Sequence, residues 1–332
     1  MIKFGNSKKL IISAAIILST TPFCSGICES NAKINSNVNS SYSQSEKFEI
    51  DQNGVLESYK GDKTEVTIPE NVKTIAFGAF MGNKKIEKVN LPEGLKNIEK
   101  LAFSDCVSLK EITIPDSVTK ISVLAFSDCK NLEKIYIGKN LDNLKRMCIN
   151  GCDNLKSIMV SDENDFLASY DGILYSKDFS SLKICPMYTK GEVKLHDNTS
   201  LISDYAFFDC KNVTGVSKIS DKIIDIEEMA FAGCSKLKSL NFTDDIGKIG
   251  SCAFSKCTAL EEFNIGKQVK KIGSSAFLGC TNLKKLFVEA KKLKLGHGIF
   301  NSCPQNILIH TDSNSSFYSY FLKHINQFSL IK

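Results

Sequence analysis

The stretch Ile265 to Val288 reads IGKQVKKIGSSAFLGCTNLKKLFV, and its pattern recurs along most of the chain. Its Ala276-Phe277 pair is repeated, with degenerate copies at Cys148-Ile149 and Ile299-Phe300. The second residue of each pair falls at positions 80, 103, 126 and 149, and then at 207, 231, 254, 277 and 300. The period is 23 residues. A fixed period of this length predicts a solenoid, in which each repeat buries its apolar face only against its neighbours.

Each repeat opens with a predicted β-strand. In the third repeat, the pattern Leu109-x-x-Ile112-x-Ile114 matches the strand of a leucine-rich repeat. Because side chains alternate along a strand, Ile112 and Ile114 should point inward, and Glu111 and Thr113 should point outward. Strands that recur every 23 residues should stack in register and form a parallel sheet.

The rest of the repeat should bring the chain back to the next strand. Pro115 lacks an N–H group, so it should end the strand, and Val118 and Ile121 then predict a second, short strand. The Ala-Phe pair is expected on a helical turn, where the small residue permits close approach and the ring fills a core layer. The predicted fold is a β-rich α/β leucine-rich repeat solenoid of about nine repeats with a parallel sheet on the concave face, an inserted hairpin and terminal caps.

The repeat resembles that of the BspA-like family of bacterial leucine-rich repeat surface proteins. The resemblance rests on the strand, the proline, the Ala-Phe pair and a cysteine three positions later, and it covers about residues 48–331. It implies a secreted or surface protein that adheres to host proteins, matrix or other cells, with a protein as its ligand. Unlike the anchored members, the segment Phe328 to Lys332 shows no hydrophobic tail, sorting motif or wall-binding module.

The first residues have the order of a secretory signal peptide. Three lysines precede the apolar run Leu10 to Leu18, and small residues such as Ser30 and Ala32 follow. We therefore expect a secreted or cell-surface protein without a membrane span after removal of the signal. The predicted segments are a signal peptide (1–32), a linker (33–47), an N-terminal cap (48–67), a first repeat block (68–160), an insert (161–200), a second repeat block (201–303) and a C-terminal cap (304–331).

Two irregularities and both ends have their own predictions. The insert should contain a hairpin around Gly172 to Cys185, and the N-terminal cap should contain another, with its turn near Lys60-Gly61. The spacing from Phe207 to Phe231 is 24 residues, which predicts a bulge between Val216 and Ile219. The C-terminal cap should contain a strand around residues 307–309, a short helix over 315–325 and a closing strand near 328–331.

Cysteine recurs at one position of the repeat. Eight of the 13 cysteines lie three residues after an anchor position, at 106, 129, 152, 210, 234, 257, 280 and 303. Side chains that point in parallel into one apolar layer favour buried free thiols over disulfides. Local pairs remain an alternative for Cys148 with Cys152 and for Cys252 with Cys257.

Composition and motifs exclude several classes of function. The formal charge is +5, but Arg146 is the only arginine, which argues against a nucleic-acid partner. The four histidines lie in no metalloprotease motif, and no phosphate loop or dinucleotide motif is present. The acidic residues Asp162, Glu163 and Asp165 are better read as a solvated turn than as a calcium site. We therefore predict no catalytic, cofactor-binding or metal-binding residues, and the protein is not expected to be an enzyme.

The outward side chains of the predicted strands are the candidate binding surface. Aromatic residues and methionine are favoured at interface centres, so the predicted partner-binding residues on the concave face are Lys134, Tyr136, Met159, Lys285 and Phe287. The leading hypothesis is thus a protein-binding or adhesion module. Two alternatives remain: a self-associating envelope component, and a secreted hydrolase with its site in the insert.

Overall fold

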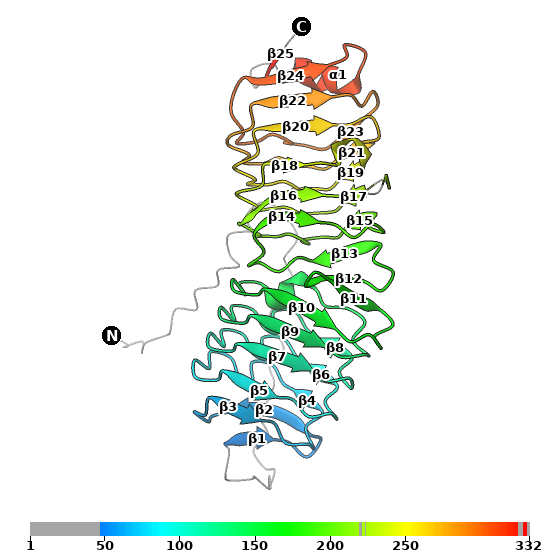
Figure 1. Ribbon diagram of the computed structural model, residues 1–332. Coiled ribbons are helices and arrows are strands. Elements are labelled where there is room, and N and C mark those ends of the chain that lie inside the picture. Colours follow the sequence, from blue (N-terminus) through cyan, green and yellow to red (C-terminus); the bar gives the residue numbers. More distant parts are fainter. Residues whose placement is uncertain (1–46, 219–220, 223, 325–327, 331–332) are drawn as a thin grey trace, which may run out of the picture. The chain divides into compact units, whose positions relative to one another are not determined.

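The computed structural model describes residues 47–218, 221–222, 224–324 and 328–330 (Figure 1). The predicted signal peptide lies outside these residues, as does the predicted linker apart from its last residue. The described chain forms a β-solenoid of about 11 turns with parallel sheets, which confirms the predicted solenoid. The number of turns exceeds the nine expected repeats because segments of the insert and of both ends also join the stacked sheets.

One row of strands corresponds to the predicted leucine-rich repeat strands, and we call it the long-strand row. Its members are β3 (Glu65–Thr67), β5 (Lys88–Asn90), β7 (Glu111–Ile114), β9 (Lys134–Ile137), β10 (Ser157–Val160), β14 (Gly191–Lys194), β16 (Val213–Ser217), β18 (Ser239–Leu240), β20 (Glu262–Ile265), β22 (Lys285–Val288), β24 (Ile307–Thr311) and β25 (Phe328–Leu330). They form three parallel sheets, ordered β10-β9-β7-β5-β3, β14-β16-β18 and β20-β22-β24-β25. Equivalent residues of neighbouring turns are paired, so Ile112 lies opposite Val89 and Ile135. In β7 the two isoleucines are buried and Glu111 and Thr113 are exposed, as predicted.

A second row consists of shorter parallel strands. They are β4 (Thr74–Ile75), β6 (Asn97–Ile98), β8 (Lys120–Ile121), β15 (Leu201–Ile202), β17 (Ile224–Ile226), β19 (Ile246–Ile249), β21 (Lys271–Ile272) and β23 (Lys294–Leu295). The predicted second strand near Ile121 is confirmed as β8, and Pro115 directly follows the end of β7. Each turn therefore has two strand faces, which enclose the core between them.

The Ala-Phe pairs lie in hydrogen-bonded turns and not in helices, and among the described residues the predicted helical turn is found only at the degenerate copy Cys148-Ile149, within the 3₁₀-helix η2 (Arg146–Ile149). In the repeat of Phe103, the backbone φ angle is 61° at Leu101 and 58° at Asp105, both in the left-handed region. Two such residues in one segment stop a right-handed helix, which needs negative φ throughout. The backbone instead pairs along the stack: the Phe103 N–H donates to the Ala125 carbonyl of the next turn at 2.7 Å.

The phenylalanine rings stack in two columns inside the solenoid. One column runs from Phe80 to Phe126 and the other from Phe207 to Phe300, with successive ring centroids between 4.7 and 5.4 Å apart. Ile149 takes the place of a ring at the end of the first repeat block, and the insert follows it. The columns accordingly lie in two separate hydrophobic clusters.

The cysteines within the described part of the chain are free thiols. They are buried, except that Cys252 and Cys303 are half-buried. In most turns the thiol donates to the phenylalanine carbonyl of the preceding turn; for example, Cys129 Sγ lies 3.1 Å from the Phe103 carbonyl oxygen. That oxygen also accepts a hydrogen bond from the Cys106 N–H at 3.2 Å. The thiols thus help to satisfy buried carbonyl groups, and the alternative of local disulfide pairs is wrong for the described cysteines.

The N-terminal end carries an antiparallel pair, β1 (Phe48–Ile50) and β2 (Val55–Tyr59). Its turn lies between Asp51 and Gly54, and not near Lys60-Gly61 as the sequence suggested. The Asp51 carboxylate accepts hydrogen bonds from the Asn53 and Val55 N–H groups at 2.9 and 2.8 Å. Gly54 has a φ of 77°. These local hydrogen bonds define the turn. β2 also pairs with β4 and so joins the second row of shorter strands.

The insert folds as three antiparallel strands, β11 (Leu167–Tyr170), β12 (Ile173–Ser176) and β13 (Ser181–Ile184). The expected hairpin corresponds to β12 and β13, whereas β11 was not predicted. One side of the insert (Leu167, Leu174 and Ile184) belongs to the core of the first repeat block, and the other (Ile173, Tyr175 and Leu182) belongs to the core of the second. The insert therefore joins two hydrophobic cores, and β13 continues directly into the parallel stack through β15.

Arg146 lies at the same junction, in the 3₁₀-helix η2 (Arg146–Ile149). Its side chain is only 4% exposed. The guanidinium donates to the carbonyl oxygen of Cys185 at 2.7 Å and also to that of Phe208. Val123, which occupies the equivalent position one turn earlier, is 42% exposed. The insert and the second repeat block therefore bury a position that faces solvent in the preceding turn.

The additional residue of the 24-residue spacing lies between two strands. Val193 pairs with Val216, 23 positions later, whereas Ile202 pairs with Ile226, 24 positions later. The extra residue therefore falls in the connection after β16, part of which (219–220 and 223) is outside the described residues. The predicted bulge between Val216 and Ile219 falls partly on those residues. Irregular pairing among the described strands occurs nearby, at Gly191/Glu192 in β14 and at Ile224/Asp225 in β17.

The C-terminal end contains the three elements that the sequence suggested. They are β24, the helix α1 (Ser316–Lys323) and β25, which pairs parallel with β24. Ser315 caps the helix by accepting a hydrogen bond from the Tyr318 N–H at 3.1 Å. Phe317 and Phe321 on one side of the helix are buried against the last turn. The remaining described 3₁₀-helix, η3 (Thr243–Asp245), precedes β19.

Candidate binding surface

The outward side chains of the long-strand row are aligned from turn to turn. Lys134 and Tyr136 lie on β9, and Met159 lies on β10. Tyr136 and Met159 are register partners, so the two side chains are direct neighbours. Met159 is 46% exposed and Lys134 is exposed, while Tyr136 is half-buried. The two side chains therefore lie side by side on this sheet, and their role in binding stays a prediction.

The other two predicted binding residues lie on β22. Lys285 is exposed and Phe287 is half-buried. The Phe287 ring stacks on the His310 ring of β24, with a centroid distance of 4.8 Å and an interplanar angle of 10°. The sheet of β20, β22, β24 and β25 is distinct from the sheet that holds Tyr136 and Met159. The five predicted residues thus form two patches, which we call the β9–β10 patch and the β22 patch.

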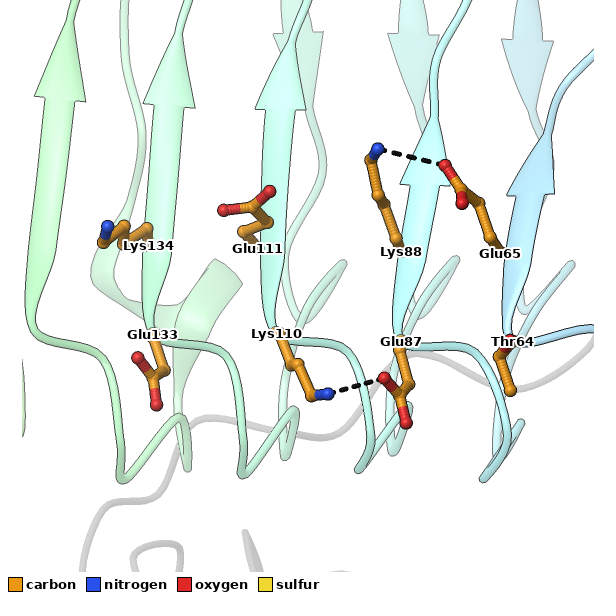
Figure 2. A pocket seen from close by; sticks show the side chains of 8 residues that line it. All are labelled: Thr64, Glu65, Glu87, Lys88, Lys110, Glu111, Glu133 and Lys134. Carbon is orange, nitrogen blue, oxygen red and sulfur yellow. Dashed lines mark hydrogen bonds and ion pairs between the residues drawn. The ribbon is translucent and has the colours of Figure 1, made fainter.

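Charged side chains at the start of the long strands form an alternating lattice (Figure 2). At the first strand position the order from turn to turn is Glu65, Lys88, Glu111 and Lys134. At the preceding position it is Glu87, Lys110, Glu133 and Lys156. Opposite charges are therefore neighbours both along each turn and between turns. Like charges stacked at the spacing of adjacent strands would repel one another, so the alternation stabilises the in-register stack.

Ion pairs connect the lattice between turns. Lys88 lies 3.0 Å from Glu65, Lys110 lies 2.5 Å from Glu87, and Lys156 lies 2.8 Å from Glu133. The hydrogen bond from Lys156 lowers the pKa of Glu133. The lattice lines a pocket of about 480 Å³ over residues 64–65, 87–88, 110–111 and 133–134. Because the charges are paired within the chain, this pocket offers a balanced polar surface rather than a strong field of one sign.

A further surface feature lies in the insert and was missed from the sequence. The rings of Tyr170, Phe179 and His196 meet around the buried ring of Tyr175. His196 follows β14, about a dozen residues beyond the end of the hairpin at Ile184, and the pairing of the insert with the next turns brings it there. A sequence signal did exist: four aromatic residues of this region are each adjacent to an aspartate, in Asp165-Phe166, Tyr170-Asp171, Asp178-Phe179 and His196-Asp197.

The candidate chemical groups are dispersed over the structure. His196 follows β14, His297 precedes β24, His310 lies within β24, and His324 ends α1. Among the residues that the structure describes, no three His, Cys, Asp or Glu side chains are grouped so as to hold a metal ion. No helix in the described ranges is long and apolar enough to cross a membrane.

Stacked leucine-rich repeat turns with an exposed strand row define the class of solenoid proteins that bind partners through aligned side chains. A model of the BspA type leucine rich repeat region matches residues 57–171 and 189–328 of this chain, in six copies. The chain therefore belongs to the BspA-type leucine-rich repeat family, as the sequence resemblance implied. A search of curated proteins finds no match.

Several solved structures are similar to this chain. The pneumococcal vaccine antigen PcpA is 22% identical, with a TM-score of 0.59, over 84% of this chain and 83% of that protein. A leucine-rich repeat protein from Bacteroides ovatus is 22% identical over 84% of this chain and 87% of its own, with a TM-score of 0.43. A leucine-rich repeat protein from Eubacterium ventriosum is 17% identical over 79% and 92%, with a TM-score of 0.48. At these identities the likeness to PcpA supports the fold alone.

Proposed function

We propose that this protein is a secreted or cell-surface adhesion module that binds a protein of a host, a matrix or another cell, and that it is not an enzyme. Membership of the BspA-type family supports a binding role of this general kind. PcpA, which shares the fold, is described as a vaccine antigen. The signal-peptide pattern of residues 1–32 supports export.

The observation that carries the proposal is the β9–β10 patch. Tyr136 and Met159 are paired in register on a sheet whose surrounding charges are largely paired with one another. An apolar pair inside a balanced polar field resembles the centre and rim of a protein interface, where aromatic and methionine side chains contribute most of the binding energy. The β22 patch offers a second contact of the same type, with Phe287 stacked on His310.

The proposal is tested by binding of the full chain to an array of matrix proteins and host-cell glycoproteins. We expect saturable binding to at least one protein, and we expect Tyr136→Ala combined with Phe287→Ala to weaken it at least tenfold, which corresponds to about 1.4 kcal/mol. A matched control replaces Glu93 and Lys100, which are exposed and lie in other segments of the turn, with alanine. Absence of any protein binding would contradict the proposal, and unchanged binding by the double variant would exclude these patches as its site.

One observation favours self-association as a second candidate. Leu322 on the terminal helix α1 is 52% exposed, which is the kind of apolar side chain after Cys303 that an end-to-end contact would use. Sedimentation velocity of the chain over a range of concentrations tests this candidate. A concentration-dependent increase in mass that Leu322→Lys removes would support it, and a monomer at every concentration would exclude it.

A further inference from the structure

The aromatic residues of the insert form one continuous group. Phe179 stacks on His196 with a centroid distance of 4.2 Å and an interplanar angle of 15°. Tyr170 meets the edge of His196 at 5.1 Å and lies 6.4 Å from Tyr175. Tyr175 is fully buried in the core of the second repeat block, so it fixes the base of the group. The outer rings are therefore held in place by a rigid element.

The outer part of this group is open to solvent. Tyr170 is 39% exposed, and Phe166, which directly precedes β11, is 51% exposed. Phe179 and His196 are half-buried. Tyr170 and Phe166 are four residues apart along an extended segment, a separation of about 13 Å. We call Phe166, Tyr170, Phe179 and His196, with the aspartates next to them, the insert rim.

Each of these rings has an aspartate next to it in the sequence. The four aspartates adjacent to the rings, Asp165, Asp171, Asp178 and Asp197, are all exposed. Residues 161–180 carry five acidic side chains and one lysine, in a chain whose formal charge is +5. Hydrogen bonds from Ser176 and Ser180 lower the pKa of Asp178 to about 2, so this carboxylate stays ionised at neutral pH. The rim is thus a local acidic region on a basic protein.

The nearby lysines bind oxygen atoms rather than the rim rings. Lys177 Nζ donates to the Asp162 carbonyl at 2.9 Å, and Lys222 Nζ donates to the Asn198 side-chain oxygen at 3.2 Å. Tyr188, outside the rim, makes cation–π contacts within the chain: the Nζ atoms of Lys190 and Lys156 lie 4.2 and 5.4 Å from the centre of its ring. Among the lysines that the structure describes, none lies over the Tyr170 or Phe166 ring.

We propose that the insert rim binds a basic segment of the partner protein, with an arginine or lysine side chain on the Tyr170 ring and its charge paired with the adjacent aspartates. A cation above an aromatic face is attracted by the ring quadrupole, and exposed carboxylates of the same segment add to that attraction. This inference rests on the proposed protein-binding function and names the surface and the chemistry of the partner. An extended segment with two basic residues four positions apart matches the separation of Tyr170 and Phe166.

Fluorescence anisotropy with the full chain tests the inference. The probe is a short fluorescein-labelled Gly/Ser peptide with two arginines four positions apart. A control peptide carries citrulline, which keeps the shape of arginine without its charge, at both positions. We expect saturable binding of the arginine peptide, affinity lower by about tenfold for the citrulline peptide, and weaker binding as salt is added.

Three variants locate the site. Tyr170→Leu should weaken binding of the arginine peptide by about tenfold, while Tyr170→Phe should retain it because the ring remains. Asp165→Asn with Asp197→Asn should weaken binding and reduce its dependence on salt. These side chains are exposed, so the fold should be unaffected, which circular dichroism checks.

Several results would overturn the inference. They are no binding of the arginine peptide, equal binding of the citrulline peptide, equal binding by Tyr170→Leu, or preferential binding of a neutral oligosaccharide. Glu93→Ala with Lys100→Ala, at exposed positions outside the insert and outside both patches, serves as the matched control and should leave peptide binding unchanged. If the chain binds an array protein but not the peptide, the inference fails and the proposed function stands; if it binds neither, both fail.

Discussion

Replacement of Arg146 by alanine should weaken the contact between the two repeat blocks, so that they no longer unfold in a single transition. The Arg146 guanidinium is the donor to two buried carbonyl groups, those of Cys185 and Phe208, which belong to the insert side and to the second block. The variant leaves both acceptors without this partner. It also removes a large side chain that is only 4% exposed.

The magnitude follows from these contacts. A buried acceptor that loses its hydrogen-bond partner costs roughly 1–3 kcal/mol. The Cys185 carbonyl still accepts from the Cys210 thiol at 3.5 Å, so the two acceptors together cost less than twice this amount, roughly 2–4 kcal/mol. Alanine also removes the desolvation penalty of a buried cation, which offsets part of this loss. We therefore expect Arg146→Ala to lower the free energy of unfolding by about 3 kcal/mol. Arg146→Lys should recover only part of it, because an ammonium group lacks the planar fork that reaches both carbonyls.

Guanidinium chloride unfolding followed by circular dichroism measures the loss. Because solenoid stability depends on interfaces between neighbouring turns, weakening one interface should also split a single transition into two. Hydrogen exchange with peptide resolution should then show faster exchange in β10 to β13 and in β15. Val123→Ala is the matched control: the residue holds the equivalent position one turn earlier, is 42% exposed, and should change stability by about 0.5 kcal/mol or less.

The reasoning would be refuted by a loss below about 1 kcal/mol in Arg146→Ala. It would also be refuted by an unchanged single transition together with unchanged exchange in the insert. Either result would mean that water or a shifted backbone satisfies the two carbonyls, and that the apolar faces of the insert hold the blocks together without the arginine.

Three further predictions concern the core, the thiols and pH. Phe254→Ala should lower the free energy of unfolding by about 3–5 kcal/mol, because this fully buried ring stacks on both neighbouring rings of its column. Phe77→Ala, at a ring that is 61% exposed, should change the free energy of unfolding by about 0.5 kcal/mol or less. Equal losses for the two variants in denaturant titrations would contradict this prediction. In the folded protein at mildly alkaline pH, a disulfide reagent should modify half-buried Cys252 before Cys106, since burial raises the pKa of the Cys106 thiol to about 12. Mass mapping of labelled peptides gives the order of modification. Labelling of Cys106 as early as Cys252 would contradict the prediction and show that the core opens. The folded pKa of Asp178 is about 2 against an ordinary 3.8, so the contribution of its ionised carboxylate to stability is present above pH 3.8 and is lost as the pH falls towards 2. Asp178→Asn should therefore lower the melting temperature at neutral pH and not at pH 2. An equal difference in melting temperature at pH 2 would show that the ionised carboxylate is not the source of the stabilisation.

Local and periodic features were predictable from the sequence. The inward Ile112 and Ile114, the end of β7 before Pro115 and the short strand at Ile121 all follow from spacing within one repeat. Such features depend on residues a few positions apart, and the same pattern is repeated many times, so the register of the stack is strongly specified. The adjacent positions of half-buried Tyr136 and exposed Met159 followed from the same alternation.

The Ala-Phe segment shows where local reasoning reached the wrong result. Alanine followed by phenylalanine is compatible with a helical turn, and the sequence pattern alone favoured one. The structure instead places Leu101 and Asp105 in the left-handed region, since the backbone pairs along the stack from Phe103 to Ala125. Hydrogen bonds to a residue in the next turn, more than 20 positions away, decided the local conformation.

The sequence by itself determined the solenoid, its period and the buried and exposed sides of its strands. Only the tertiary structure decided how the insert is used: each of its sides packs on a different core, it buries Arg146, and it brings His196 to Tyr170. It also decided that Tyr136 and Phe287 belong to different sheets. The physical reason is that a repeat fixes contacts between equivalent positions, whereas the place of a non-repeating segment depends on which distant apolar surfaces it can cover.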